Sequence, residues 1–335
     1  MALLQGLTRA SWWHPRLSHA VRCEALKQSL PVPDLFDKRL VFVMGKGGVG
    51  KSTVSIALGL AAAERGLRTI VCEVASQENA SRVFKKGEVG FNEVAVSENL
   101  WAISIDPDES LREYLLLQLK VRAMRDLLMR SRLFNYLAAA TPGLKEMVTI
   151  GKVWELAQRR VKKGREYDLV IVDSPATGHG VGFLQTPRTF AGIARMGPIH
   201  NQAQALDGFI TDQEQTGAVI VSLPEEMPVN ESASLERQLI DDVGVAVDRV
   251  YMNAMYPERF TPEEAAKLER VLEITEGSTH AAVRAAVSQW RRYRSQHEQL
   301  RRLERGVKTP VRQLPFVFKP KLGVGELQML AGSLT

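Results

Sequence analysis

The sequence predicts an α/β fold with a doubly wound, mostly parallel sheet. Residues 39–44 form a short apolar run that ends in glycines, and residues 52–65 follow it with an Ala/Leu-rich helical pattern. A second β-rich run at 69–74 begins soon after Gly66 ends the helix. A strand, a loop, a helix and a strand in this order form a right-handed crossover unit with parallel strands. Repetition of such units builds a sheet that is covered by helices on both faces.

The rest of the chain supplies the other elements of this sheet. Five further runs are predicted as strands: 100–105, 169–173, 218–223, 247–252 and 309–314. Residues 281–305 are predicted as one long, arginine-rich helix. The stretch 107–163 has no strand pattern, so we expect an all-helical subdomain inserted into a single domain over 38–335. We interpret 1–37 as a loosely ordered extension and expect ordered structure from Lys38; a transit peptide or an amphipathic surface segment are the alternatives.

Composition narrows the classes of function. The 335 residues carry 45% apolar and 24% charged side chains, which are ordinary values for a globular protein. The 44 basic and 38 acidic residues leave a net charge of +6, which suits an anionic small ligand as well as nucleic acid. Cys23 and Cys72 form no CxxC pair, so we expect no zinc site and no disulfide framework, and we expect a cytoplasmic protein. No run of about 18 apolar residues predicts a membrane span.

A glycine-rich segment directly after the first predicted strand matches the P-loop pattern GxxxxGK[ST]. It reads Gly45-Lys46-Gly47-Gly48-Val49-Gly50-Lys51-Ser52-Thr53. In this pattern the glycines let the backbone wrap so that its N–H groups face phosphate oxygens, and the positive end of the following helix points at the same anion. Lys51 would reach the β and γ phosphates, and the hydroxyl of Ser52 would serve Mg²⁺. We therefore expect residues 45–53 to bind a nucleotide with its metal ion.

A second acidic position lies at the end of the predicted strand 169–173. An apolar strand that ends in Asp173 places this carboxylate at the carboxyl edge of the sheet, beside the glycine-rich segment. Mg²⁺ prefers oxygen ligands and keeps several of its waters. We expect Asp173 to act on the Mg²⁺ side of the site through coordinated water.

Further residues carry a resemblance to a known family. Lys46, directly after the first glycine, resembles the deviant Walker A form of the P-loop. The run Ser174-Pro175-Ala176-Thr177-Gly178-His179, followed by Phe183-Leu184-Gln185-Thr186-Pro187, resembles switch II of the ArsA and tail-anchored-protein targeting ATPases. Three further segments are similar to that family: 141–146, Asn253 after the strand 247–252, and Leu314-Pro315-Phe316. The resemblance extends from about Lys38 to the end of the chain.

This resemblance implies a Mg²⁺-dependent ATPase that dimerises around two nucleotides. In the deviant Walker A class, the lysine that corresponds to Lys46 reaches across the dimer interface and neutralises charge on the partner's nucleotide, as an arginine finger does. Asn253 and Pro315 would contact adenine. ATP would close the dimer, hydrolysis would open it, and the helical insertion would act as a lever on a client protein or an anion. The partner would be a second copy of this chain or a paralogue.

The sequence departs from the family pattern in two places. The insertion 107–163 has no cysteine, so we do not expect arsenite as the ligand. Residues 72–79 read CEVASQEN where the family has D-P-A-x-N, so the aspartate that orients the attacking water is missing. We expect Glu73 to take its place, with Glu78 as the second candidate. If neither does, the protein would be a nucleotide-gated interaction module that does not hydrolyse ATP.

The arginine-rich helix at 281–305 supports a different hypothesis. A ParA- or MinD-like positioning ATPase would use such a helix to contact DNA or an acidic membrane. The switch II run at 174–187 and the insertion at 107–163 are not typical of that class. An ArsA-like ATPase is therefore the preferred interpretation, and DNA or membrane contact is the alternative.

Overall fold

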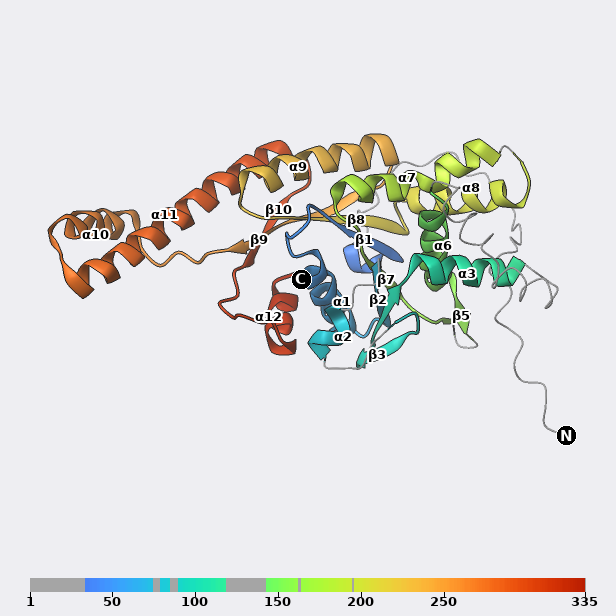
Figure 1. Cartoon of the computed structure of the whole chain (residues 1–335), viewed down its shortest axis with the longest axis horizontal. Helices are drawn as coiled ribbons and strands as arrows, with labels where there is room; N and C mark the ends of the chain where they lie inside the picture. Colours follow the sequence, from blue (N-terminus) through green and yellow to red (C-terminus); the bar gives the residue numbers. More distant parts are fainter. Residues whose placement is uncertain are drawn as a thin grey trace.

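The computed structural model describes residues 34–74, 79–84, 90–118, 143–161, 164–194 and 196–334, and one large sheet runs through it (Figure 1). Across this sheet the strands are β10 (Val311–Pro315), β9 (Val247–Met255), β8 (Thr216–Ser222), β1 (Leu40–Met44), β7 (Leu169–Asp173), β2 (Thr69–Val74), β4 (Leu100–Ile105) and β3 (Val94–Ser97). Neighbouring strands are parallel except β3, which pairs antiparallel with β4 at the edge. The predicted α/β fold with a mostly parallel sheet is confirmed.

Helices cover both faces of the sheet. One face carries α1 (Lys51–Glu64), α2 (Asn79–Phe84), α12 (Val324–Leu334) and the 3₁₀ helix η1 (Leu35–Asp37). The other carries α6 (Leu144–Gln158), α7 (Thr177–Ala194), α8 (Pro198–Thr211) and α9 (Glu226–Arg237), which continues into the π-helical turn η2 (Gln238–Val243). Helix α3 (Pro107–Gln118) packs on α6.

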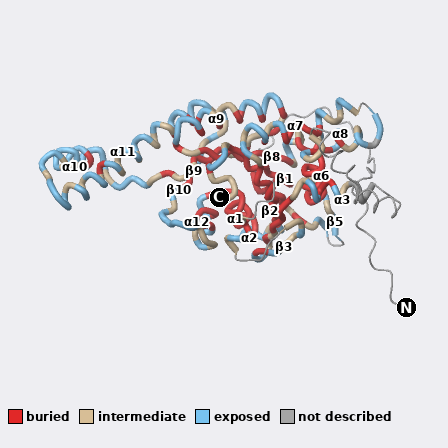
Figure 2. The backbone as a smooth tube through the Cα atoms, viewed as in Figure 1, coloured by how far each residue is buried: buried red, intermediate tan, exposed pale blue. Residues whose placement is uncertain are grey.

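Strand β1 shows how the sequence builds this sandwich. Its side chains alternate, so that Phe42 and Met44 enter the core beneath α6 and α7 whereas Val41 and Val43 enter the core beneath α1. All five residues of the strand are buried, as expected for a central strand of a parallel sheet. Figure 2 shows that the buried residues are concentrated in the sheet and in the helices that lie directly on it. The carboxyl end of β1 therefore delivers the glycine-rich segment to a rigid sheet edge.

Helices α10 (Pro262–Ile274) and α11 (Gly277–Gly306) connect β9 to β10 and form an arm that projects beyond the edge of the sheet (Figure 1). Helix α11 has 30 residues, which corresponds to a length of about 45 Å. Thr261 and Glu264 form a reciprocal capping box that fixes the start of α10. The outer arm buries Ala265 and Val287 and is otherwise largely exposed (Figure 2). The long helix predicted at 281–305 is confirmed, but its projection from the sheet was not predicted.

Three local features differ from the sequence prediction. The described structure begins at Asp34 and not at Lys38, because the apolar residues of η1 are buried against the core under α1. The stretch 107–163, predicted without strands, ends in β5 (Arg160–Val161), which forms a hairpin with β6 (Gly164–Arg165). Strand β3 was not predicted, because it has four residues of which one is buried. The expectations for 1–33 and 119–142 concern residues outside the described ranges and stay predictions.

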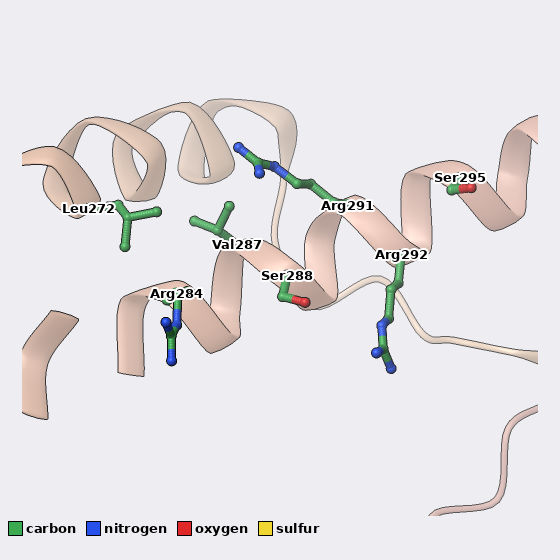
Figure 3. A pocket seen from close by; sticks show the side chains of 7 residues that line it. All are labelled: Leu272, Arg284, Val287, Ser288, Arg291, Arg292 and Ser295. Carbon is green, nitrogen blue, oxygen red and sulfur yellow. The ribbon is translucent and has the colours of Figure 1, made fainter. Parts of the chain in front are cut away.

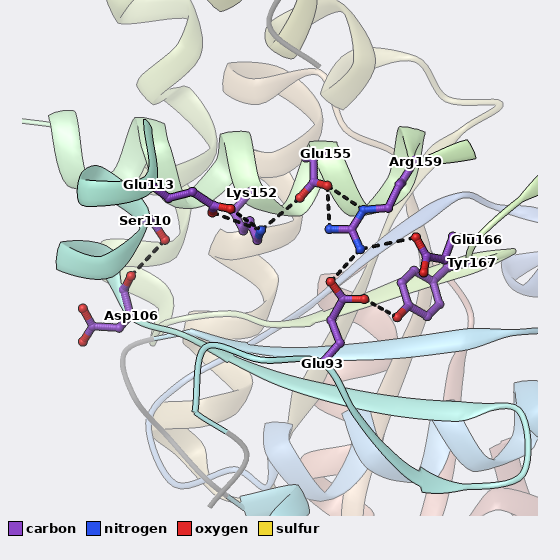
Figure 4. A network of polar contacts seen from close by, with 9 residues as sticks. All are labelled: Glu93, Asp106, Ser110, Glu113, Lys152, Glu155, Arg159, Glu166 and Tyr167. Atoms are coloured by element: carbon purple, nitrogen blue, oxygen red, sulfur yellow. Dashed lines mark hydrogen bonds and ion pairs between the residues drawn. The ribbon is translucent and has the colours of Figure 1, made fainter. Parts of the chain in front are cut away.

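An ionic network fixes the end of α6 to the edge of the sheet (Figure 4). Arg159, directly after α6, pairs with Glu155 at 2.5 Å, with Glu93 at 2.6 Å and with Glu166 at 3.3 Å. Tyr167 donates its hydroxyl to Glu93 at 2.5 Å. Burial by itself would raise the pKa of Glu93, but the hydrogen bonds from Tyr167 and Arg159 outweigh it and hold that pKa below 4.5. Arg159 is thus the cation that three carboxylates share.

The network continues from α6 to α3. Lys152 of α6 pairs with Glu113 of α3 at 3.0 Å and with Glu155 at 3.1 Å. The side chains of Lys152 and Glu155 are 8% and 9% exposed, so this ion pair is shielded from solvent, whereas Glu113 is 36% exposed. The two described helices of the predicted insertion are therefore joined to each other and to the sheet by one chain of charges.

Candidate functional site

The glycine-rich segment lies at the carboxyl edge of the sheet, between β1 and α1. Gly45 has a φ of 147°, and a Cβ atom there would lie 2.2 Å from the backbone oxygen of Val221 in β8. Gly50 has a φ of 94°, and a Cβ atom there would lie 2.5 Å from Nδ2 of Asn253. A side chain at either position would push the segment away from the strands. These two glycines therefore let the segment lie directly against the sheet.

Helix α1 begins directly after the segment and directs its N-terminus toward it. Gly50 is the N-cap and offers no side chain to the first N–H groups of the helix. These N–H groups and the helix dipole favour an anion at this end. Lys51 donates from Nζ to the backbone oxygen of Lys46 at 3.1 Å. Burial lowers the pKa of Lys51, and the charge of Asp173 partly offsets this shift. Backbone donors and an ammonium group thus meet at the N-terminus of α1, an arrangement that favours an anion.

Asp173 lies at the end of β7 and contacts the start of α1. Its Oδ2 accepts a hydrogen bond from the Ser52 hydroxyl at 2.5 Å. Its Oδ1 is buried and has no hydrogen-bond partner among the described residues. Burial raises the pKa of Asp173, whereas Ser52 and Lys51 oppose this shift. A buried carboxylate oxygen without a partner, next to a hydroxyl group, suits the oxygen ligands of Mg²⁺. The residues present therefore fit the predicted metal ion.

Glu73 lies at the end of β2 beside Asp173, because the two are partners in the β2–β7 register. It is 1% exposed, and its carboxylate accepts hydrogen bonds from the backbone N–H groups of Asn79 at 2.9 Å and Ala80 at 3.3 Å. Burial raises the pKa of Glu73 to about 7; the N–H groups of Ala80 and Asn79 oppose this shift, and Asp173 adds to it. This contact with the start of α2 was not predicted. Glu78 lies outside the described residues.

The substitution Glu73→Gln separates the charge of this side chain from its hydrogen bonds. A carboxyl with a folded-state pKa of about 7 against an ordinary 4.5 ionises at a cost to the folded state. The stability that Glu73 contributes is therefore fully present below pH 4.5 and is lost as the pH rises through 7. We expect Glu73→Gln to exceed wild type by about 1–2 kcal/mol in free energy of unfolding at pH 8, and to match it near pH 4.5. Urea unfolding across this range measures the difference, and parallel pH profiles would contradict it.

Turnover of the same variant tests the predicted role of Glu73 at the attacking water. If Glu73 orients that water, Glu73→Gln loses ATPase rate although it gains stability. Glu236→Gln is the matched control, because Glu236 is also 1% exposed and accepts hydrogen bonds from the backbone N–H groups of Lys308 and Thr309. We expect this control to keep its ATPase rate.

Asn253 lies in β9 against the glycine-rich segment. Its Nδ2 donates to the backbone oxygen of Val49 at 2.9 Å, and its Oδ1 accepts from the N–H of Ala254 at 2.9 Å. Ala254 has a φ of 62°, a conformation that stores backbone strain in a residue with a side chain. The nitrogen and the oxygen of the Asn253 side-chain amide are thus both hydrogen-bonded within the chain. The hydrogen bond from Asn253 to the glycine-rich segment was not predicted. Pro315 pairs in register with Met255, so it lies at the same edge of the sheet.

Aromatic side chains gather beside this edge. The rings of Tyr256, Phe316 and Phe318 lie with centroids 4.8 to 5.6 Å apart. Phe316 is 37% exposed and Phe318 is 53% exposed. Sequence reasoning missed this cluster, because its members come from two segments that meet only across β9 and β10.

Lys46 forms an ion pair with Glu231 of α9. Its Nζ lies 2.7 Å from Oε1 of Glu231, and the two side chains are 32% and 35% exposed. Glu231 is 185 positions away in sequence, and no local motif marks it as a partner. The structure therefore adds a contact within one chain to a residue that was predicted to act in the site of a partner.

The segment that resembles switch II follows Asp173 and borders the glycine-rich segment. A Cβ atom on Gly47 would lie 3.9 Å from that of Ala176. Gly180, in the first turn of α7, packs so closely that a Cβ atom there would lie 2.9 Å from Cε of Met44. Helix α7 then packs against α6 and α8. The segment that resembles switch II therefore lies beside the glycine-rich segment and leads into a helix that packs on its neighbours on this face.

The arginine-rich helix lies on the arm. A pocket between α10 and α11 is lined by arginine, serine and apolar side chains: Leu272, Arg284, Val287, Ser288, Arg291, Arg292 and Ser295 (Figure 3). Three arginines of α11 pair with glutamates: Arg291 with Glu269 at 3.0 Å, Arg294 with Glu298 at 3.4 Å, and Arg302 with Glu226 at 3.3 Å. These ion pairs neutralise part of the positive charge of α11. The hypothesis that this helix contacts DNA or an acidic membrane depends on that charge. In the described part of the chain, no helix is long and apolar enough to span a membrane.

Comparison with known proteins agrees with this site. The model of the anion-transporting ATPase (ArsA_ATPase) family matches residues 38–206, which is half of the chain. ATPase BagA of Mycobacterium tuberculosis is 29% identical over 239 residues, which cover 68% of each chain. ATPase GET3 of Chaetomium globosum is 31% identical over 176 residues, covering 51% of this chain and 50% of that protein. ATPase GET3 of Kluyveromyces lactis is 27% identical over 259 residues, covering 66% of this chain and 74% of that protein. The chain therefore belongs to the anion-transporting ATPase family and is an ATP-binding ATPase.

Proposed function

We propose that this chain is a Mg²⁺-dependent ATPase that works as a homodimer around two nucleotides and uses ATP hydrolysis to handle a client protein or an anion. The observation that carries the proposal is the meeting of Lys51, Ser52 and Asp173 at the N-terminus of α1, where one buried oxygen of Asp173 has no hydrogen-bond partner within the described part of the chain. A phosphate group and its Mg²⁺ would satisfy these groups together. A heterodimer with a paralogue is the alternative assembly.

The residues of the site take separate roles in this proposal. The backbone of Gly45, Gly47, Gly48, Val49, Gly50 and Thr53 would surround the phosphates. Lys51 would bind the β and γ phosphates, and Ser52 and Asp173 would hold Mg²⁺, which would neutralise phosphate charge during hydrolysis. Glu73 would orient the attacking water, since it lies beside Asp173 in the register. Asn253, Pro315 and the exposed aromatic cluster at the ends of β9 and β10 would receive the adenine.

Two features support coupling of hydrolysis to a client. Helix α7 packs tightly on the end of β1, since a Cβ atom on Gly180 would lie 2.9 Å from Cε of Met44, and α7 also packs on α6 and α8. Large apolar side chains are exposed where α7 ends and α8 begins: Ile193 is 74% exposed, Met196 81% and Ile199 51%. A change at the γ phosphate would therefore move helices that present apolar surface.

The dependence of the ATPase rate on protein concentration tests the shared site. A site completed by Lys46 of a second copy requires the rate to rise faster than linearly at low protein concentration and then to become proportional to it. A rate that is linear throughout would contradict the dimer. Bound ATP without turnover would contradict Glu73 as the residue that orients water.

Lys46→Ala is the sharper version of this test. We expect the variant to bind ATP as wild type does, and to lose turnover by about a thousandfold together with ATP-driven dimerisation, because the charge that neutralises the partner's nucleotide is gone. Isothermal titration, rate measurement and sedimentation report the three properties. Normal hydrolysis by a monomeric Lys46→Ala variant would contradict the role in the partner's site.

Mixing two inactive variants provides the control. A Lys46→Ala protomer keeps its own Lys51, and a Lys51→Ala protomer still offers Lys46, so a mixed dimer has one complete site. An equal mixture should recover ATPase activity that neither variant shows alone, at up to about half of the wild-type rate, because a mixed dimer has one complete site of two. No recovery in a mixture that does form mixed dimers would place the action of Lys46 within its own chain.

A further inference from the structure

We propose that Glu231 is a positioning residue, which holds Lys46 in a resting position until the nucleotide and the second protomer compete for it. The inference rests on the proposed function, in which Lys46 acts in the site of the partner. The observation that carries it is the ion pair between Nζ of Lys46 and Oε1 of Glu231 at 2.7 Å. At this distance the ammonium group is hydrogen-bonded to the carboxylate of Glu231. The ion pair must therefore break before Lys46 can reach a phosphate in the site of a second protomer.

Both ends of this ion pair are held by rigid elements. On one side, Gly45 lies directly against the backbone of β8, which is the hydrogen-bonded neighbour of β1. On the other side, α9 follows β8 and is anchored to the core through the buried residues Val229 and Leu235. Packing therefore sets the distance between the two backbones, and the ion pair costs only the ordering of two side chains.

In this conformation both lysines of the glycine-rich segment, Lys46 and Lys51, donate hydrogen bonds to oxygen atoms of the protein itself. Lys51 donates to the backbone oxygen of Lys46, and Lys46 donates to the carboxylate of Glu231. Phosphate oxygens are strong acceptors for both ammonium groups. When Lys51 turns to a phosphate it releases the backbone of Lys46, so the remaining restraint on Lys46 is Glu231.

The exposure of the pair sets its strength. With side chains 32% and 35% exposed, solvent screens the interaction, and such pairs shift an equilibrium by roughly threefold. A restraint of this size holds Lys46 within its own chain when no nucleotide is bound. Contact of Lys46 with the triphosphate bound by a second protomer is strong enough to break the ion pair. Glu231 therefore sets the protein concentration at which the dimer forms.

The test compares Glu231→Gln with wild type, because glutamine keeps the size of the side chain and removes its charge. We expect the dimer dissociation constant, measured by sedimentation with a non-hydrolysable ATP analogue, to fall by about tenfold, since two ion pairs break in each dimer. The protein concentration at half-maximal ATPase rate should fall in parallel. The kcat at saturating protein should stay unchanged, and the effect should shrink at about 0.5 M salt.

Two controls separate this role from general structural effects. Glu226→Gln, on the same helix, removes the ion pair with Arg302 at 3.3 Å and should leave the dissociation constant and kcat unchanged. In a Lys46→Ala background, Glu231→Gln should restore neither ATP-driven dimerisation nor turnover, because Glu231 acts through Lys46.

The other outcomes overturn the inference. A weaker dimer, or a lower kcat at saturating protein, would mean that Glu231 works in the closed dimer. An unchanged dissociation constant, or dimerisation regained by Glu231→Gln in the Lys46→Ala background, would mean that the ion pair does not restrain Lys46. Failure of the proposed function has a different signature, since wild type itself would then form no ATP-dependent dimer, and both proposals would fall.

Discussion

Lys51→Ala is expected to abolish ATP binding and hydrolysis. The side chain of Lys51 is the ammonium group closest in sequence to the N-terminus of α1, and it lies in the field of the buried Asp173 carboxylate. Removing it would leave that carboxylate, the phosphates and any Mg²⁺ with one positive charge fewer. We expect kcat/KM to fall by at least about a hundredfold, and isothermal titration to show no saturable ATP binding at concentrations that saturate wild type.

Lys145→Ala is the control for this loss. Lys145 also lies in the first turn of a helix, α6, and forms an exposed ion pair with Asp108 at 2.7 Å. It should bind ATP as wild type does. Thermal unfolding of both variants shows whether the fold is retained. A folded Lys51→Ala protein with wild-type ATP affinity would overturn the assignment of residues 45–53 as the phosphate site.

Arg159→Ala is expected to produce the largest loss of stability outside the site. The guanidinium is 22% exposed and pairs with three carboxylates, so its removal leaves Glu93, Glu155 and Glu166 in partial burial without their shared cation. Breaking a buried pair by removing one partner costs about 3 kcal/mol or more. We expect the free energy of unfolding in urea to fall by about 3 kcal/mol and the midpoint of thermal unfolding to fall by several degrees.

The pH dependence of this loss identifies its electrostatic part. In the folded protein the pKa of Glu93 lies below its ordinary value of 4.5, through its hydrogen bonds with Tyr167 and Arg159. The ionised Glu93 therefore contributes stability that is present above pH 4.5 and is lost as the pH falls through the folded-state value. The difference between wild type and Arg159→Ala should be full at pH 7 and should shrink below pH 4.5.

Arg294→Ala is the matched control for the network. Arg294 pairs with Glu298 one turn away on α11, with side chains that are 69% and 56% exposed. An exposed pair of this kind contributes about 0.5 kcal/mol or less. A loss of similar size in the two variants would show that the network at Arg159 behaves as a solvated surface cluster.

Local sequence was sufficient for the parts of this protein that depend on neighbouring residues. The strand at 39–44, the glycines and the start of α1 lie within one continuous segment, so their spacing alone predicted a strand, a loop and a helix. The strand ending in Asp173 was predicted from its apolar run and its terminal acid, and the register then placed Asp173 beside Glu73. Strand β3 and the β5–β6 hairpin escaped prediction because strands of two to four residues have no usable periodicity.

Contacts between distant segments could not be predicted in the same way. Asn253 braces Val49 from 204 positions away, and Glu231 holds Lys46 from 185 positions away. Each contact exists because β8 lies next to β1 and β9 lies next to β8, an order across the sheet that no single segment encodes. The hydrogen bonds from the backbone of α2 to Glu73 likewise depend on how α2 returns to the end of β2.

The sequence by itself therefore determined the fold class and the family, and it predicted the phosphate-binding segment, because these depend on the identity and spacing of consecutive residues. Only the tertiary structure decided which side chains from other strands and helices reach that segment. It paired Lys46 with Glu231 and, within the ranges it describes, left one oxygen of Asp173 without a hydrogen-bond partner. It also decided that α11 projects as part of an arm. The physical reason is that strand order and helix packing minimise the free energy of the whole chain, whereas a motif reports only on the residues within it.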